Sequence, residues 1–169
     1  MTFSKDILTL AQSVVTLCTD KKIMLTTAES CTGGLVAGAI TEIPGASGCL
    51  MGSFVTYSDF MKTRLLGVSP ETLDEFGAVS EQTAREMASG AIKAASADVG
   101  VAITGIAGPG GGTEEKPVGL VHFASARRVD GNIHTHHEEH LFGSKNRQDI
   151  RAEAVKVALN MLELEARNY

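Results

Sequence analysis

Short apolar segments with strand-like spacing alternate along this chain with segments of helical spacing, and this alternation narrows the possible folds more than any other feature. The strand-like segments lie at 21–30, 52–58, 98–105, 117–127 and 133–142. The helical segments lie around Ile7–Cys18, at 33–43, 70–76 and 81–96, and from Arg147 onward. Strands that alternate with helices, with one hairpin late in the chain, predict an α/β sandwich around a mixed sheet.

Capping and turn residues indicate several boundaries of these elements. A Ser-Pro-Glu triplet at 69–71 combines an N-cap, a first-turn proline and an acidic first turn, and Gly77 is expected to close this short helix. Ser80 is expected to cap the next helix. An Asp-Gly-Asn triplet at 130–132 predicts the turn of the hairpin.

Composition excludes several classes of protein. With 169 residues, of which 43% are hydrophobic, the chain is expected to form a single globular domain over 1–169. The net charge of −5, without a basic stripe, argues against nucleic acid as a partner. No segment resembles a signal peptide or a membrane span, so no membrane partner is expected. Three cysteines, too far apart for a metal knuckle, indicate a reduced cytoplasmic protein with free thiols.

The stretch "TTAESCTGG" follows the first strand-like segment and opens the next helix. The start of a helix offers unpaired N–H groups and a partial positive charge, which suit an anion or a developing oxyanion. Ser30 and Thr32 supply hydroxyls, and Gly33 and Gly34 let a ligand approach the backbone. The alternative is that Ser30 or Thr32 only caps the helix.

Two further segments contain residues suited to chemistry. In "GSFVTYSDFMK", Tyr57 ends a strand and Lys62 follows about one helical turn later, so a neutral lysine is available to accept a serine proton. Taken alone, such a pair is more typical of a packed ring and a solvated ammonium. The loop "TGIAGPGGGTEEKPVG" holds six of the eighteen glycines, and its N–H groups, with Lys116, are candidates for binding a phosphate.

Two other patterns leave alternatives open. "HTHHEEH" puts His134, His136 and Glu138 on one face of a strand, as in some zinc sites, but it is more typical of a solvated edge strand. Arg147 and Arg151 are four residues apart on the last helix. One of them is a candidate phosphate clamp, and surface ion pairs are the alternative.

Together, "TTAESCTGG", "GSFVTYS" with the following lysine and "LLGV", "FGAVSEQTA" and "TGIAGPGGGTEEKPVG" resemble the C-terminal domain of the CinA (competence/damage-inducible protein) family. The motifs occur in that family's order, from Thr26 to Arg151. The resemblance implies a three-layer α/β/α sandwich with a mostly parallel sheet, often a homodimer. It also implies nicotinamide mononucleotide amidohydrolase activity, which releases ammonia and gives nicotinic acid mononucleotide. Larger members carry a further N-terminal domain, so this chain resembles the stand-alone deamidases.

The resemblance also implies roles for individual residues. Ser30 matches the nucleophile, Lys62 the lysine that activates it, and Tyr57 the tyrosine beside them. The expected substrate-binding residues are Thr32, Gly33, Gly34, Thr104, Gly105, Ala107, Gly108, Gly110 and Arg147.

The resulting hypothesis is a serine amidohydrolase that needs no metal and no cofactor. The phosphate of a nucleotide substrate binds backbone N–H groups and Arg147, Lys62 takes the Ser30 proton, and amides at 31–34 stabilise the oxyanion. The alternatives are a non-catalytic nucleotide-binding or regulatory module and a metal-dependent hydrolase that uses His134 and His136. DNA binding is disfavoured by the acidic charge balance.

Overall fold

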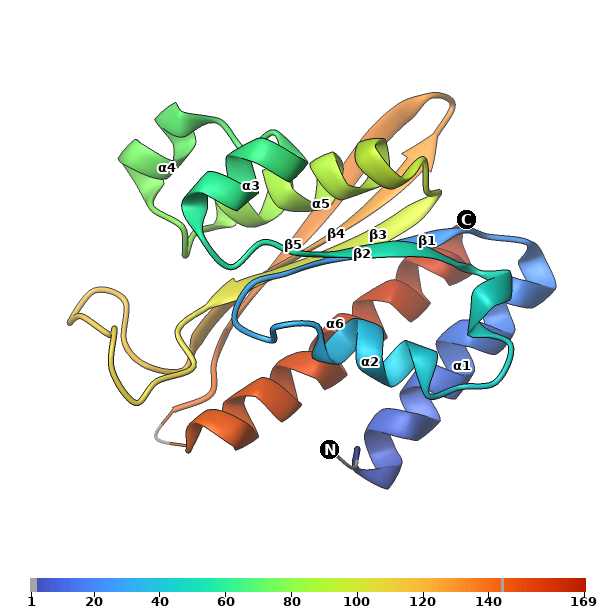
Figure 1. Cartoon of the computed structure of the whole chain (residues 1–169), viewed down its shortest axis with the longest axis horizontal. Helices are drawn as coiled ribbons and strands as arrows, with labels where there is room; N and C mark the ends of the chain where they lie inside the picture. Colours follow the sequence, from blue (N-terminus) through green and yellow to red (C-terminus); the bar gives the residue numbers. More distant parts are fainter. Residues whose placement is uncertain (1–2, 144) are drawn as a thin grey trace.

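A five-stranded sheet lies between two layers of helices in the computed structural model of the chain, which describes residues 3–143 and 145–169 (Figure 1). The strands are β1 (Leu25–Glu29), β2 (Leu50–Val55), β3 (Val99–Gly105), β4 (Leu120–Val129) and β5 (Asn132–Leu141). The helices are α1 (Lys5–Lys21), α2 (Leu35–Thr41), the 3₁₀ turn η1 (Ala46–Gly48), α3 (Asp59–Leu66), α4 (Pro70–Phe76), α5 (Glu81–Ala95) and α6 (Arg147–Asn168). The predicted three-layer α/β/α sandwich is confirmed.

The sheet has the order β2-β1-β3-β4-β5 and is mixed, as predicted. β1 pairs in parallel with both β2 and β3, whereas β4 is antiparallel to both of its neighbours. Four of the five strands therefore run in one direction. The central strands β1 and β3 are almost entirely buried, as expected for strands covered on both faces.

Helices α1, α2 and α6 cover one face of the sheet, and α3, α4 and α5 cover the other (Figure 1). The larger core cluster lies under α1 and α6 and includes Val101 and Phe123. The smaller cluster lies under α5 and includes Ala102 and Ala124. Neighbouring residues of β3 and β4 thus alternate between the two cores, because side chains alternate across a strand. In the described part of the chain, no helix is long and apolar enough to cross a membrane.

The predicted capping and turn residues lie at the ends of the helices and strands as expected. The Ser69 and Ser80 hydroxyls accept backbone N–H bonds at the starts of α4 and α5, and Gly77 ends α4 with φ +77°. The hairpin turn consists of Asp130 and Gly131, both with positive φ, as a two-residue turn between twisted strands requires.

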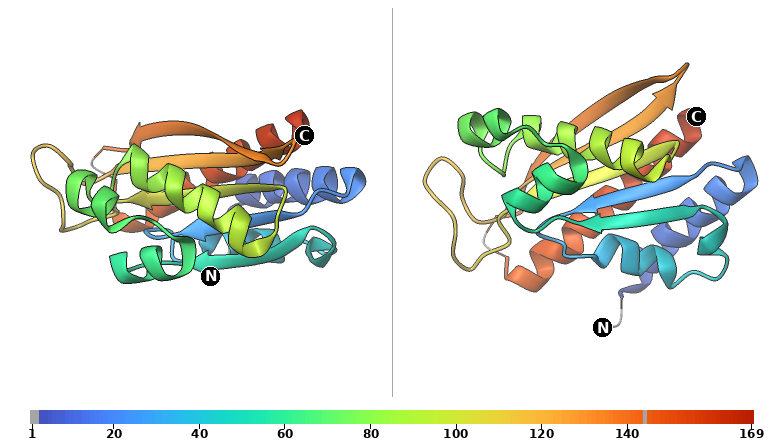
Figure 2. Two further views of the ribbon diagram at one scale, coloured as in Figure 1. Left: turned by 90° about the horizontal axis from the view of Figure 1, so that it is seen from above. Right: turned by 45° about the horizontal axis from the view of Figure 1, so that its top comes forward.

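The segments that follow β1, β2 and β3 meet at one edge of the sheet because these three strands are parallel (Figure 2). The chain leaves β1 towards α2 on one face and reaches β3 from α5 on the opposite face. Such a reversal opens a crevice beyond the carboxyl ends of the strands, which is the usual ligand site of open α/β sheets.

Candidate active site

A pocket of about 220 Å³ lies at this carboxyl edge of the sheet. Its walls come from the ends of β1 and β3, the start of α3, the segment before α5 and the start of α6. The lining residues are Ser30, Cys31, Tyr57, Asp59, Lys62, Ala78, Val79, Thr104, Gly105, Ala107 and Arg147. Segments far apart in the sequence therefore share one concave site, as binding sites commonly require.

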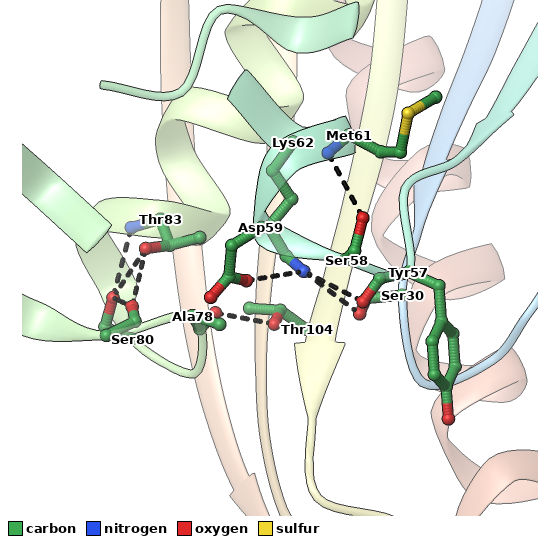
Figure 3. Close-up of polar contacts among 11 residues, drawn as sticks. Ser30, Tyr57, Ser58, Asp59, Met61, Lys62, Ala78, Ser80, Thr83 and Thr104 are labelled. Carbon is green, nitrogen blue, oxygen red and sulfur yellow. Dashed lines mark hydrogen bonds and ion pairs between the residues drawn. The ribbon is translucent and has the colours of Figure 1, made fainter. Parts of the chain in front are cut away.

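Ser30 and Lys62 lie in contact inside this pocket. The Lys62 Nζ donates a hydrogen bond of 3.4 Å to the Ser30 Oγ, and the lysine is only 1% exposed (Figure 3). The same Nζ lies 3.4 Å from Asp59 Oδ1 and donates at 3.5 Å to the Tyr57 carbonyl. A hydroxyl and an amine at this distance are within reach of direct proton transfer.

Local structure explains why the lysine points inward. Ser58 caps α3 by accepting the N–H of Met61 on its hydroxyl, and Asp59 occupies the first turn. Lys62 follows one turn after this cap, on the face of α3 that packs towards the sheet together with Leu66. The cap therefore fixes the residue at which α3 begins, and this start places the Lys62 side chain on the buried face of the helix.

Cys31 lies next to Ser30 and also lines the pocket. Burial raises the pKa of its thiol to about 12. Since the thiolate is the nucleophilic form of cysteine, this thiol is inert at neutral pH. The hydroxyl that contacts an amine is the better nucleophile of the two neighbours.

Tyr57 contacts Lys62 through its backbone rather than its ring. Tyr57 is 63% exposed, and its ring points away from the Lys62 Nζ (Figure 3). Its hydroxyl accepts a bond of 3.4 Å from Arg147. The tyrosine therefore stands at the rim of the pocket beside an arginine, and not between serine and lysine.

The two arginines of α6 have different surroundings. Arg147 lines the pocket, and its Nη1 donates at 2.8 Å to the Gly108 carbonyl. Arg151, one turn later, donates to the carbonyls of Cys31 and Thr32 at 3.1 and 2.8 Å. Arg147 thus faces the cavity, whereas Arg151 is engaged with the backbone after β1.

The start of α2 is occupied by a carboxylate of the chain itself. Glu29 is fully buried, and its carboxylate accepts N–H bonds of 2.9–3.1 Å from Gly34, Val36 and Ala37. It also accepts the Thr27 hydroxyl at 3.2 Å. A buried anion is stable here because it meets the N–H groups and the positive end of the helix dipole.

This arrangement corrects the expectation that the amides of Gly33 and Gly34 bind the substrate or its oxyanion. The Gly34 amide donates to Glu29 and the Gly33 amide to the Ser30 carbonyl, so neither is available to a substrate. Gly34 is itself the N-cap and makes no side-chain bond, so neither Ser30 nor Thr32 caps α2. Both glycines have positive φ, and the tight turn explains them. The Thr32 side chain is fully buried.

The glycine-rich loop contributes only its first residues to the pocket. Gly105 and Ala107 line it, together with Thr104, whose hydroxyl donates to the Ala78 carbonyl at 2.7 Å (Figure 3). Gly108 contributes the carbonyl that orients Arg147, and Gly110 is exposed away from the lining.

Lys116, a candidate phosphate ligand by sequence, is engaged elsewhere. Its Nζ donates to the Phe76 carbonyl at 2.6 Å. It thereby satisfies the last turn of α4, where a cation also complements the helix dipole. Its charge is thus committed to the end of a helix rather than to the pocket lining.

The histidine-rich strand is the edge strand β5, as expected. His137 Nε2 lies 3.0 Å from Nδ1 of His122 on β4, and Glu138 lies 2.8 Å from His140. Within residues 3–143 and 145–169, no group of three or more histidine, cysteine or acidic side chains is arranged to hold a metal ion.

Several residues of the site were not predicted from sequence. Ala78 and Val79 carry no chemical signal, and only the packing of α5 beside β3 brings them to the pocket. Glu29, in contrast, did carry a signal in the sequence. A charged residue at the end of an apolar strand, just before a helix, is the pattern of a carboxylate that caps the helix N-terminus.

Comparison with known proteins identifies the family. A family model described as the CinA C-terminal domain matches residues 7–166, almost the whole chain. The chain belongs to the CinA C-terminal domain family. Its resemblance to that family, inferred from four sequence motifs, is thereby confirmed.

Solved structures of CinA proteins have the same fold. The competence/damage-inducible protein CihA from Agrobacterium tumefaciens is 51% identical, with a TM-score of 0.91 over 96% of each chain. A CinA superfamily protein from Escherichia coli is 37% identical, with a TM-score of 0.85 over 97% of this chain and 94% of that one.

Curated relatives in the CinA family are longer than this chain. A putative competence-damage inducible protein of Alkaliphilus oremlandii is 42% identical over 98% of this chain but only 39% of its own length. A CinA-like protein of Chlorobaculum tepidum is 51% identical over 74% of this chain and 30% of its own. The chain therefore spans about two fifths or less of these relatives.

Proposed function

We propose that this CinA-family protein is a nicotinamide mononucleotide amidohydrolase in which Ser30 is the nucleophile and Lys62 the proton acceptor. The observation that carries the proposal is the 3.4 Å contact between Lys62 Nζ and Ser30 Oγ inside a pocket at the carboxyl edge of the sheet. Burial excludes water from this amine, and the inert Cys31 thiol leaves the serine as the nucleophile.

In the first half of the reaction, the Ser30 Oγ attacks the carboxamide carbon while its proton passes to Lys62. The tetrahedral intermediate then collapses, the C–N bond breaks, and the Lys62 ammonium returns the proton to the leaving nitrogen, which departs as ammonia. The enzyme is left as an ester on Ser30. The Lys62 Nζ that accepts the proton also lies 3.4 Å from Asp59 Oδ1.

In the second half, water attacks the ester carbonyl and gives its proton to Lys62. Collapse of the second intermediate releases nicotinic acid mononucleotide, and the proton returns to Ser30. The overall change is hydrolysis of one amide to a carboxylate and ammonia. In each step the protein group that accepts or returns the proton is a side chain of the pocket, so the proposal uses no metal and no cofactor.

The substrate phosphate is assigned to the rim of the pocket. Arg147 offers a guanidinium there, and its present partners are a carbonyl and the Tyr57 hydroxyl, which are weaker acceptors than a phosphate. Arg151 is a poorer candidate because two backbone carbonyls already accept its N–H groups. In this arrangement the nicotinamide ring enters the pocket, with its carboxamide next to Ser30.

The test is ammonia release from nicotinamide mononucleotide by purified protein in the presence of EDTA. We expect turnover by the wild type, and a loss of at least about a thousandfold in kcat for Ser30→Ala and for Lys62→Met. Trapping with substrate should add the mass of the acyl group to the peptide that contains Ser30. Binding of the nucleotide without any turnover would favour a regulatory module instead.

A further inference from the structure

The turn after β1 leaves two amides without an oxygen acceptor beside the proposed nucleophile. The Ser30 carbonyl accepts the Gly33 N–H at 3.0 Å, and the Thr32 carbonyl accepts the Leu35 N–H at 3.4 Å. The later amides at the start of α2 donate to Glu29. Among the described residues, the amides of Cys31 and Thr32 donate to no oxygen atom. Both approach the Cys31 sulfur, a weak acceptor; burial raises the pKa of this thiol, and the two N–H groups lower it slightly against that effect.

Arg151 fixes the direction in which one of these amides points. Its guanidinium draws the Cys31 and Thr32 carbonyls to the side of α6, at 3.1 and 2.8 Å. In a planar trans peptide the C=O and N–H point in opposite directions. Because the Cys31 carbonyl faces Arg151, the Thr32 N–H must point away from it. A Cβ at Gly33 would lie 3.4 Å from the Arg151 Nη2, so the guanidinium packs closely against this turn.

The bond from Gly33 fixes the other amide by the same rule. Since the Ser30 carbonyl accepts the Gly33 N–H inside the turn, the Cys31 N–H is directed outward. Glu29 stabilises this turn from the α2 side because its carboxylate accepts the N–H groups of Gly34, Val36 and Ala37. Two charged side chains, one on β1 and one on α6, therefore hold the four residues after β1 in one conformation.

We propose that Arg151 and Glu29 are positioning residues that hold the amides of Cys31 and Thr32 as the oxyanion donors of the Ser30 reaction. This inference rests on the proposed serine mechanism, and it assigns a role to two residues that do not touch the substrate. The N–H of the residue after a nucleophile is a common oxyanion donor because it lies beside the attacked carbonyl. Donors fixed before the reaction cost no reorganisation when charge develops.

The first test compares three arginines of α6. Arg151→Gln should lower kcat about a hundredfold or more, with KM changed by less than about threefold, because oxyanion donors act on the transition state. Arg147→Lys should mainly raise KM. Arg167→Gln, near the far end of α6, removes an arginine that pairs with Glu163 and should leave both constants unchanged. In Arg151→Lys, the ammonium can still donate to the two carbonyls but lacks the planar geometry of the guanidinium, so kcat should be higher than in Arg151→Gln and lower than in the wild type.

The second test does not depend on the substrate. A fluorophosphonate probe forms a P–O bond to Ser30 Oγ, its P–F bond breaks, fluoride leaves, and the hydroxyl proton passes to Lys62. The phosphoryl oxygen then occupies the oxyanion position. The labelling rate, measured by intact mass, should fall about a hundredfold in Arg151→Gln and be unchanged in Arg167→Gln. Glu29→Gln places an amide N–H₂ against backbone donors, and should slow labelling as well where it folds.

The outcomes separate the two proposals. Labelling of Ser30 that Arg151→Gln slows, without turnover of nicotinamide mononucleotide, would discard the substrate and retain the positioning role. Turnover by the wild type with equal kcat and equal labelling in a folded Arg151→Gln would overturn the positioning role alone. A wild type that neither turns over the nucleotide nor labels at Ser30 would overturn both.

Discussion

The chemistry of the site depends on what burial does to neighbouring side chains. Ser30 and Cys31 are adjacent and both line the pocket, but only the serine contacts Lys62. Burial raises the pKa of the Cys31 thiol to about 12, which removes its thiolate at physiological pH. Two adjacent positions of the chain thus hold a hydroxyl in contact with an amine and a thiol that stays protonated.

We expect Cys31→Ala to retain activity within a few-fold of the wild type. We also expect iodoacetamide at pH 8 to leave Cys31 unmodified in the folded protein, because roughly one thiol in ten thousand is ionised there. Mass spectrometry after alkylation checks this, and all three cysteines should react in urea. Rapid alkylation of native Cys31 with parallel loss of activity would instead identify the thiol as the nucleophile.

At the scale of elements, two stacked histidines of the β4–β5 hairpin pack beside the start of α5. His122 and His137 lie 3.0 Å apart, with Glu139 and Glu81 each 3.6 Å from one of the rings. Desolvation lowers the pKa of both histidines below their ordinary 6.5, and the two glutamates oppose this only in part. The folded protein therefore favours neutral rings.

In the unfolded chain, His122 and His137 bind protons near pH 6.5, whereas in the folded protein they bind protons only at a lower pH. The pair's stabilisation is therefore complete above pH 6.5 and is lost as the pH falls below it. We expect the urea midpoint to drop between pH 7.5 and 5.5 by less in His137→Gln than in the wild type. His134→Gln, an exposed position of β5, serves as the control. Identical pH dependence in all three proteins would show that the pair does not titrate as described.

At the scale of the whole molecule, the site depends on how closely α5 approaches α3. Gly90 lies in the middle of α5, and a Cβ there would be 1.9 Å from the Leu66 carbonyl oxygen at the end of α3. Backbone atoms cannot move aside as a side chain does. The absence of a Cβ thus lets α3 sit where Lys62 reaches Ser30.

Gly90→Ala should therefore destabilise the protein by about 2–3 kcal/mol, as overpacking does. In an open helix the same change stabilises by about 1 kcal/mol, so the sign is diagnostic. Gly52→Ala is the control, because no atom lies within 4 Å of the Cβ it would add. Urea unfolding measures both, and the folded fraction of Gly90→Ala should also have a reduced kcat. A stabilised Gly90→Ala would refute this account of the packing.

The sequence by itself determined the features that depend on residues a few positions apart. The caps at Ser69 and Ser80 and a hairpin turn within 130–132 were predicted because each involves hydrogen bonds or φ angles within about four residues. The α/β class followed from the order of strand-like and helical segments. The family followed from four motifs in order, which supplied Ser30 and Lys62 as candidates.

Only the tertiary structure decided which side chains meet. It assigned the α2 amides to Glu29, Arg151 to the turn after β1, the Tyr57 ring to the rim, and Lys116 to the end of α4. The physical reason is that each of these contacts joins segments whose distance is set by strand order and helix packing. A polar group buried by folding must find its partner among whatever the fold brings near it, and local sequence does not contain that information.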